Sequence, residues 1–439
     1  MSIIDDKSIF IAMKQNGPLR VEDDLSFGCK FNNYARKSVA LFRKDPSIIT
    51  KYRAVRSQVF DLLQVDGFNE IKQLIDSPVL SQQRTDRTYV LLANLYGISG
   101  DLAEIKNRIR EYATSADAVI AHLKNRVMTD HQPNIEISNE IEVIHNPVDL
   151  LLIIFNQNYH KKARFEAKRK LVLMSLAGSI DQRERETEIE NKFSAFLDFL
   201  NQYVWSSELK IGELKTTYLL SSHNEKDYSC TDVRVIEDSE AVATITPNDL
   251  EKLTLVKRRL FKSIGKDIPI YVTVRKKDAA AKILKLLRKN EKNPAVAVDD
   301  ELGLMAVLDN VADVKRFVRH LTRAALKADS IMVLEDISDT LTGGYYHATS
   351  SGSSSSTPML KFFARLGGIR VEFIIHTNQT YLNYRYQRDI AHDEYEVKRI
   401  FDSGVSEFLF PEDIYKLDMG LLRKELLRKS RKIIENHKT

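Results

Sequence analysis

The spacing of apolar residues divides the chain into two halves. From residue 1 to about 205, apolar positions recur every three or four residues and glycine and proline are scarce, a pattern typical of amphipathic helices. From about Ser206 the pattern changes to short apolar runs separated by polar turns, and such runs predict β-strands. Three of these runs are Thr216–Leu220, Asp232–Ile236 and Ala241–Ile245.

After Pro247, helical and strand-like segments alternate. The predicted helices cover Asn248–Ile264, Lys277–Asn290, Val311–Ala328 and Tyr381–Ile400. The predicted strands cover Ile268–Val274, Gly303–Leu308, Ile331–Leu334, Met359–Leu366 and Ile369–Thr377. Gly367 and Gly368 join the last two strands, and paired glycines allow the positive φ angles of a tight hairpin turn. This succession predicts a mixed β-sheet flanked by helices.

We therefore expect an α+β protein in which a helical N-terminal half precedes the mixed sheet. The expected segments are a helical domain over 1–205, a β-rich connector over 206–247, a mixed-sheet domain over 248–410 and a basic helix over 411–439. A length of 439 residues agrees with two or three domains.

The C-terminal helix carries the basic bias of the chain. In residues 421–439, Lys and Arg exceed Asp and Glu by five, which equals the net charge of +5 for the whole chain. Leu422, Leu426 and Ile433 fall at helical spacing and predict an amphipathic helix. Such a helix is suited to the phosphates of RNA or DNA, or to an acidic protein. The alternative is a solvated terminal helix whose apolar stripe packs against the rest of the protein.

A second basic stretch, residues 161–170, lies in the helical half. Lys and Arg side chains on a helix usually keep their charged ends in solvent, because burying an unpaired charge is costly. We therefore interpret this stretch as a solvated helix face, with a nucleic-acid groove as the alternative.

The composition argues against a membrane protein and against a disulfide scaffold. The longest apolar run, Leu150–Phe155, has six residues, whereas a membrane helix needs about 20. Asp5 and Lys7 interrupt the first residues, so a secretory signal is not expected. Cys29 and Cys230 are the two cysteines, too few for a disulfide framework. We expect no membrane association and a reducing, cytoplasmic environment.

Several common enzyme motifs are absent from the sequence. It contains no G-x-G-x-x-G, H-E-x-x-H, C-x-x-C or G-x-S-x-G segment. Gly265 and Lys266 are followed by Asp267 where a P-loop requires Ser or Thr. The most common dinucleotide-binding, zinc-protease, hydrolase and NTPase classes are therefore not expected.

Two carboxylates are the candidate metal ligands. Asp300 precedes a buried strand, and Glu372 lies inside another strand on the face opposite Val371 and Phe373. A carboxylate in an apolar strand is costly to bury without a partner. Two such groups on neighbouring strands are suited to Mg²⁺, which prefers oxygen ligands and would stabilise a transferring phosphoryl or nucleotidyl group. The alternative is that Glu372 forms a salt bridge with Arg370 or Lys361.

Cationic and aromatic residues near these acids are candidates for nucleotide binding. Arg275 and Lys277 end a predicted strand and are placed to contact phosphates. Tyr345 follows Gly343 and Gly344 and is placed to stack on a base. The alternative is that the tyrosines pack in the core.

Residues 250 to 400 resemble the synthetase domain of RelA/SpoT-type enzymes. The family's motifs R-x-K, D-x-x-G-x-R, D-Y-I, G-Y-R-S and V-E-x-Q-x-R-T, followed by a histidine, are matched in order. The matching segments are Arg275–Lys277, Asp300–Met305, Glu335–Asp339, Gly344–His347, Val371–Thr377 and His392. The family transfers pyrophosphate from ATP to the 3′-hydroxyl of GDP or GTP.

The resemblance implies roles for six residues and a nucleotidyltransferase fold. It implies that Asp300 and Glu372 hold Mg²⁺ and that Glu372 also accepts the proton of the attacking hydroxyl. Arg275 and Lys277 then contact the phosphates of ATP. Tyr345 stacks on the acceptor base, and His392 completes the nucleotide-binding residues.

This sequence departs from the family at four motif positions. The family has arginine, arginine, glutamine and arginine where this chain has Met305, Tyr346, Ile374 and His376. Each lost arginine removes a bidentate contact to phosphate. Two alternatives follow. Either the acceptor differs, and the basic stretches favour RNA over a free guanine nucleotide, or the domain is a catalytically degenerate structural protein, such as a virion or complex subunit.

Overall fold

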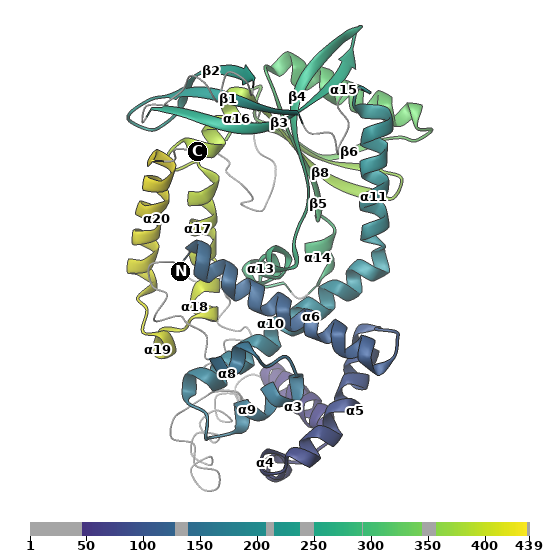
Figure 1. Ribbon diagram of the computed structural model, residues 1–439, viewed down its shortest axis with the longest axis vertical. Coiled ribbons are helices and arrows are strands. Elements are labelled where there is room, and N and C mark those ends of the chain that lie inside the picture. Colours follow the sequence, from purple (N-terminus) through teal and green to yellow (C-terminus); the bar gives the residue numbers. More distant parts are fainter. Residues whose placement is uncertain are drawn as a thin grey trace. The chain divides into compact units, whose positions relative to one another are not determined.

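The computed structural model describes residues 46–127, 139–207, 215–237, 250–291, 293–344 and 357–436 (Figure 1). The chain divides into two compact units, each built from separate segments. The helical unit contains residues up to Arg183, Ala279–Pro294 and Ile400–Leu422. The sheet unit contains Glu184–Asp278, Ala295–Arg399 and the residues from Arg423 onward.

The described part of the helical unit is built from helices. Its helices are α3 (Pro46–Leu63), α4 (Phe68–Asp76), α5 (Pro78–Tyr96), α6 (Leu102–His122), η1 (Leu123–Val127), α8 (Asn139–Glu142), α9 (Pro147–Phe155), most of α10 (Lys161–Thr187), α13 (Ala279–Lys289), α18 (Val405–Leu409) and α19 (Glu412–Tyr415). The sequence specifies some starts directly, since Asp101 and Glu104 form a reciprocal capping box at α6. Within the described ranges, no helix combines the length and apolar content required to cross a membrane.

The basic stretch at the start of α10 is buried, so the prediction of a solvated face was wrong. Arg169 is buried and donates a hydrogen bond of 2.8 Å from Nη1 to Tyr415 Oη. Tyr415 Oη in turn donates to Glu166 Oε1 at 2.8 Å. Lys170 is also buried and its amine lies 2.8 Å from Asp117 Oδ2. These cations are buried because each has an acidic or phenolic partner, which repays part of the cost of desolvation.

The sheet unit contains one eight-stranded sheet with the order β2-β1-β3-β4-β5-β8-β7-β6 (Figure 1). Its strands are β1 (Lys215–His223), β2 (Cys230–Glu237), β3 (Glu251–Ser263), β4 (Lys266–Lys276), β5 (Leu302–Leu308), β6 (Val333–Asp339), β7 (Leu360–Leu366) and β8 (Ile369–Thr377). Among the described strands, only β5 and β8 pair in parallel; the other neighbours are antiparallel. The described chain is therefore α+β with a mixed sheet, as predicted.

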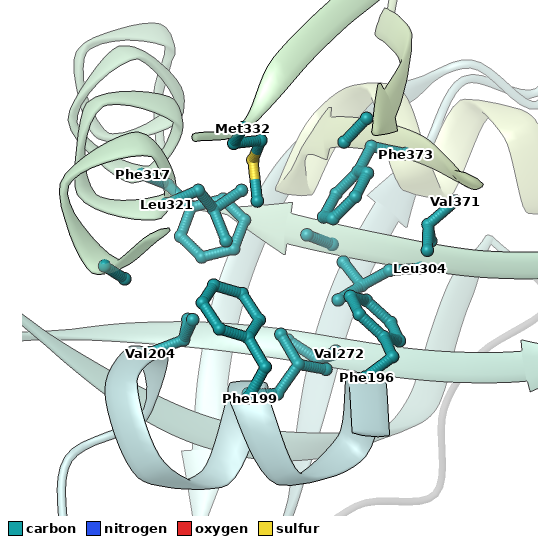
Figure 2. Packing of buried hydrophobic residues seen from close by; sticks show 14 of the residues in the cluster. Phe196, Phe199, Val204, Val272, Leu304, Phe317, Leu321, Met332, Val371 and Phe373 are labelled. Carbon is teal, nitrogen blue, oxygen red and sulfur yellow. The ribbon is translucent and has the colours of Figure 1, made fainter. Parts of the chain in front are cut away.

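The helices of the sheet unit are α11 (Ile189–Phe199), η3 (Leu200–Val204), α14 (Ala295–Val298), α15 (Val311–Lys327), α16 (Asn378–Tyr386), most of α17 (His392–Asp402) and most of α20 (Met419–Asn436). One face of the sheet packs against α11, η3 and α15 to form the core (Figure 2). Phe196 and Phe199 of α11 and Phe317 of α15 share this core with Val272 of β4. The opposite face of the sheet carries the polar side chains considered below.

Most predicted elements of the sheet unit are confirmed, with different ends. The strands predicted at Thr216–Leu220, Asp232–Ile236 and Gly303–Leu308 lie within β1, β2 and β5, and the Gly367-Gly368 hairpin joins β7 and β8. The strand predicted at Ile331–Leu334 is β6, which begins two residues later, at Val333. The helix predicted over Tyr381–Ile400 is two helices, α16 and α17. The strand predicted at Ala241–Ile245 lies outside the described residues.

The helix predicted over Asn248–Ile264 was wrong, because this segment forms strand β3. Lys252, Thr254 and Val256 alternate with more exposed residues along β3 and face one side of the sheet. Leu253 and Leu255 lie on the other side of the strand. Read together with Val256, which follows Leu253 by three residues, they imitate the spacing of a helix. A mixed apolar run fits both periods, and pairing with β1 and β4 decides between them.

Gly178 provides a test of packing in the helical unit. A Cβ added at Gly178 would lie 2.7 Å from Cζ of Tyr96, and Tyr96 is buried against the ring of Tyr112. We expect Gly178→Ala to lower the free energy of unfolding by about 1–3 kcal/mol, although alanine favours a helix by about 1 kcal/mol. Hydrogen exchange in α5 and α10 measures the effect. Ser179→Ala on the same helix is the control, and equal protection in both variants would contradict the expected clash.

Candidate functional site

The candidate site lies on the face of the sheet opposite the core. Along β8, Val371 and Phe373 point into the core (Figure 2). Because side chains alternate along a strand, Glu372 and Ile374 point to the other face. Glu372 is nevertheless buried, with only 8% of its side chain exposed. A buried carboxylate in this position requires cationic partners.

One partner reaches Glu372 across an intervening strand. Arg275 on β4 pairs with Gly303 on β5, and Gly303 pairs with Glu372 on β8, so the three residues form one row across the sheet. Neighbouring strands are about 4.8 Å apart, and glycine leaves the middle of the row open. Arg275 Nη2 donates to Glu372 Oε2 at 3.1 Å. A Cβ on Gly303 would lie 3.0 Å from Arg275 Nε, so the glycine makes room for the guanidinium group.

The second partner comes from the other side of β8. Lys361 on β7 pairs with Ile374 and is the diagonal neighbour of Glu372. Its amine lies 2.8 Å from Glu372 Oε1, so each carboxylate oxygen has its own cation. Of the two partners named in the alternative interpretation, Lys361 is confirmed. The other, Arg370, pairs with Glu335 instead.

Asp300 approaches the same region through Lys277. The amine of Lys277 lies 2.8 Å from Asp300 Oδ1 and donates to the Asp300 carbonyl oxygen at 2.8 Å. Burial holds the pKa of Lys277 below its ordinary value, although the carboxylates of Asp300 and Glu372 partly oppose this shift. Lys277 thus contacts Asp300 directly, and Glu372 lies close enough to affect its pKa. We call Arg275, Lys277, Asp300, Lys361 and Glu372 the polar cluster.

The cations of the polar cluster keep Glu372 ionised. Burial alone raises the pKa of the Glu372 carboxyl, but Lys361, Lys277 and Arg275 outweigh this effect, and the pKa lies below its ordinary value. The cluster therefore contains three basic and two acidic side chains. Its net charge is positive, which favours an anion such as a phosphate group over a cation.

His392 lies beside the cluster in a row of neighbouring, mutually tilted rings. The ring centroids of His376 and Tyr384 are 5.4 Å apart, and those of Tyr384 and His392 are 5.1 Å apart. Burial lowers the pKa of both histidines, for His376 to about 4, so both are neutral at neutral pH. Arg275 is close enough to affect the pKa values of Tyr384 and His392. The structure thus brings together five of the six predicted site residues; Tyr345 lies outside the described residues.

The structure adds Lys361 and Tyr384 as members of the site. Lys361 entered the sequence interpretation only as a possible salt-bridge partner. A tight turn at Gly367 and Gly368 fixes the register of the hairpin, so the position of Lys361 near Glu372 is implied by the sequence. Tyr384 has no comparable signal, because its position depends on where α16 begins, at the cap Thr377.

The carboxylates in this arrangement do not fit a Mg²⁺ ion held by the protein alone. Mg²⁺ needs free carboxylate oxygens, but both oxygens of Glu372 and Oδ1 of Asp300 already lie close to cationic groups. Among the described residues, no three His, Cys, Asp or Glu side chains are grouped as metal ligands. The expected Mg²⁺ requirement stays a prediction.

The C-terminal helix α20 has one buried face and one basic face. Leu422 and Leu426 are buried as its apolar stripe predicted, but Ile433 is 52% exposed and Ile434 is buried instead. Ile434 packs against Cys230, and the adjacent Glu435 carbonyl accepts a hydrogen bond from Lys252. These contacts fix which residue turns inward near the end of the helix. The outward face contains exposed basic residues at four-residue spacing: Lys424, Arg428 and Lys432.

Comparisons with protein-family models, curated proteins and solved structures found no match for this chain. No relative therefore assigns a role to the polar cluster. Its chemistry follows from the distances and charges above.

The partnership of Lys361 and Glu372 provides a test of the cluster. We expect Lys361→Met to lower the free energy of unfolding by about 1–3 kcal/mol near neutral pH, because a buried carboxylate loses one of its charged partners. Fluorescence of Trp205, the single tryptophan and buried in the sheet unit, reports this transition. Lys262→Met, at an exposed position on β3, is the control.

The pH dependence of this effect has a defined sign. The pKa of Glu372 in the folded protein lies below its ordinary value of 4.5, so its ionised form stabilises the fold above that pH. This contribution is lost as the pH falls through the folded pKa. The difference between wild type and Lys361→Met is therefore expected to shrink below about pH 4.5. A difference that grows in acid would show that Lys361 does not stabilise the ionised carboxylate.

Proposed function

We propose that the polar cluster binds the phosphates of ATP and that the sheet unit transfers a pyrophosphate or nucleotidyl group to a hydroxyl acceptor. The acceptor is a guanine nucleotide or RNA, and the fold is a RelA/SpoT-like nucleotidyltransferase domain. The observation that supports the proposal is the convergence of Arg275 and Lys277 with Asp300 and Glu372. These residues come from segments far apart in the sequence.

The geometry suits each residue to one part of the reaction. The Arg275 side chain is 44% exposed, so its guanidinium group is accessible to a phosphate and has the planar shape for bidentate contact. Lys277 adds a second cation from the same strand end. Glu372 is ionised and is able to accept the proton of the attacking hydroxyl. In pyrophosphate transfer, that oxygen bonds to the β-phosphorus, the bond between β-phosphorus and the α–β bridging oxygen breaks, and AMP leaves.

A non-catalytic binding role is the second candidate. The row next to Gly303 and Glu372 contains Met305 paired with Ile374, and neither side chain donates a hydrogen bond to phosphate. This apolar row supports a structural or assembly role for the same surface. If binding measurements showed that the protein binds neither ATP nor an acceptor, that result would favour the structural or assembly role.

Transfer from labelled ATP tests the catalytic proposal. We expect label to appear on GDP, GTP or RNA in the presence of Mg²⁺, and Glu372→Gln to reduce the rate by at least about 100-fold, because a general base contributes that much or more. Glu335→Gln is the matched control, since Glu335 is a half-buried acid of the same sheet that pairs with Arg365. Absence of label on every acceptor would contradict catalysis.

Salt-dependent binding tests RNA as the acceptor. We expect the triple variant Lys424→Glu, Arg428→Glu, Lys432→Glu to bind RNA more weakly and to reduce the slope of log K against log salt by about 2–3, because each lost phosphate contact removes about 0.7–0.9.

The matched control for RNA binding reverses three exposed lysines of β3 and β4: Lys257, Lys262 and Lys266. An equal loss in both triple variants would indicate only a general effect of charge. An unchanged slope in the α20 variant would exclude its basic face as the RNA contact.

A further inference from the structure

The two counter-ions of Glu372 differ in how firmly they are held. Lys361 is 15% exposed and sits on the strand that pairs directly with β8. Arg275 is 44% exposed and reaches Glu372 only by crossing the open position at Gly303. Arg275 is therefore the partner that an incoming ligand meets first, and it is the one able to move without disturbing the sheet.

The charges of the cluster favour one order of binding. Arg275, Lys277 and Lys361 outnumber Asp300 and Glu372, so an isolated divalent cation approaches a site of like charge. A phosphate is attracted to the same site and offers Arg275 two oxygens in place of one carboxylate oxygen. When Arg275 turns to the phosphate, Oε2 of Glu372 loses its partner. The phosphate also brings the negative charge that a divalent cation requires.

We propose that Arg275 is an exchangeable counter-ion of Glu372, which a nucleotide phosphate draws away and thereby opens Glu372 to a divalent cation. Lys361 acts as a positioning residue that keeps Glu372 in place during the exchange. The protein without nucleotide then excludes metal, although it binds phosphate without metal. The identity of the phosphate as that of a nucleotide rests on the proposed function.

Binding of Mn²⁺ alone, measured by electron paramagnetic resonance, tests the exchange without any need for activity. We expect the wild-type protein to leave the spectrum of free Mn²⁺ unchanged and Arg275→Gln to bind Mn²⁺ at least tenfold more tightly. Arg370→Gln removes the same charge from β8 at a residue that pairs with Glu335 and Asp336, and it should behave like wild type. The increase in Mn²⁺ affinity must disappear in the double variant Arg275→Gln, Glu372→Gln. This control distinguishes binding at Glu372 from binding at adventitious surface sites.

A second variant guards against misfolding of the first. Gly303→Val keeps Arg275 but places side-chain atoms where the guanidinium group crosses β5, so it too should increase Mn²⁺ affinity. Fluorescence of Trp205 checks that both variants remain folded. Wild-type protein that binds Mn²⁺ as tightly as Arg275→Gln would overturn the proposal, as would folded variants that show no gain.

Calorimetry with pyrophosphate and ATP in EDTA completes the test. We expect both to bind wild type in EDTA without metal and, in a separate titration without EDTA, Mn²⁺ to bind the protein once either is present. Binding and exchange without transfer of label would support the exchange while refuting the proposed catalytic function. Binding of neither ligand under any condition would overturn both.

Discussion

A carboxylate buried in the middle of a β-sheet sets the constraint that organises the sheet unit. Glu372 lies on β8 with its neighbours Val371 and Phe373 in the core, so its own side chain cannot turn toward that core without losing its charge. Arg275 and Lys361 come from strands on either side to neutralise it. Their positions depend on the parallel pairing of β5 with β8 and on the register of the β7–β8 hairpin. The order of strands and the charge balance of the site are therefore linked.

Local patterns were enough to predict much of the fold. The β7–β8 hairpin follows from the paired glycines, and α15 follows from a strongly amphipathic sequence that begins after the cap Asn310. The segment of β3 was misread because Leu253 and Leu255 combine with Val256 into a run that fits a helix as well as a strand. Only its pairing with β1 and β4 decides the outcome, and long-range pairing is not visible in a local window.

The sequence indicated which residues lie near one another in the candidate site, but it did not indicate which of them form direct contacts. Asp300, Glu372, Arg275 and Lys277 converge, as their order along the chain indicated. The sequence did not reveal that cations occupy the carboxylate oxygens, because the reach of Arg275 over Gly303 depends on which strands are neighbours. The prediction that the basic stretch in α10 is solvated was wrong for the same reason. Arg169 is buried because Tyr415, far away in the sequence, supplies a partner.

The parallel pairing of β5 with β8 also affects how the chain folds. β5 is followed by α15, β6 and β7 before β8 arrives to lie beside it, so the chain must complete the hairpin before β5 gains its second neighbour. Until then, the almost wholly apolar strand β5 has one open edge, which is able to pair with strands of other molecules. A chain interrupted before Ile369 would therefore expose an aggregation-prone strand edge. It would also leave Arg275 and Lys361 without the Glu372 carboxylate. Completion of β8 closes the edge and places the Glu372 carboxylate between these cations in one step.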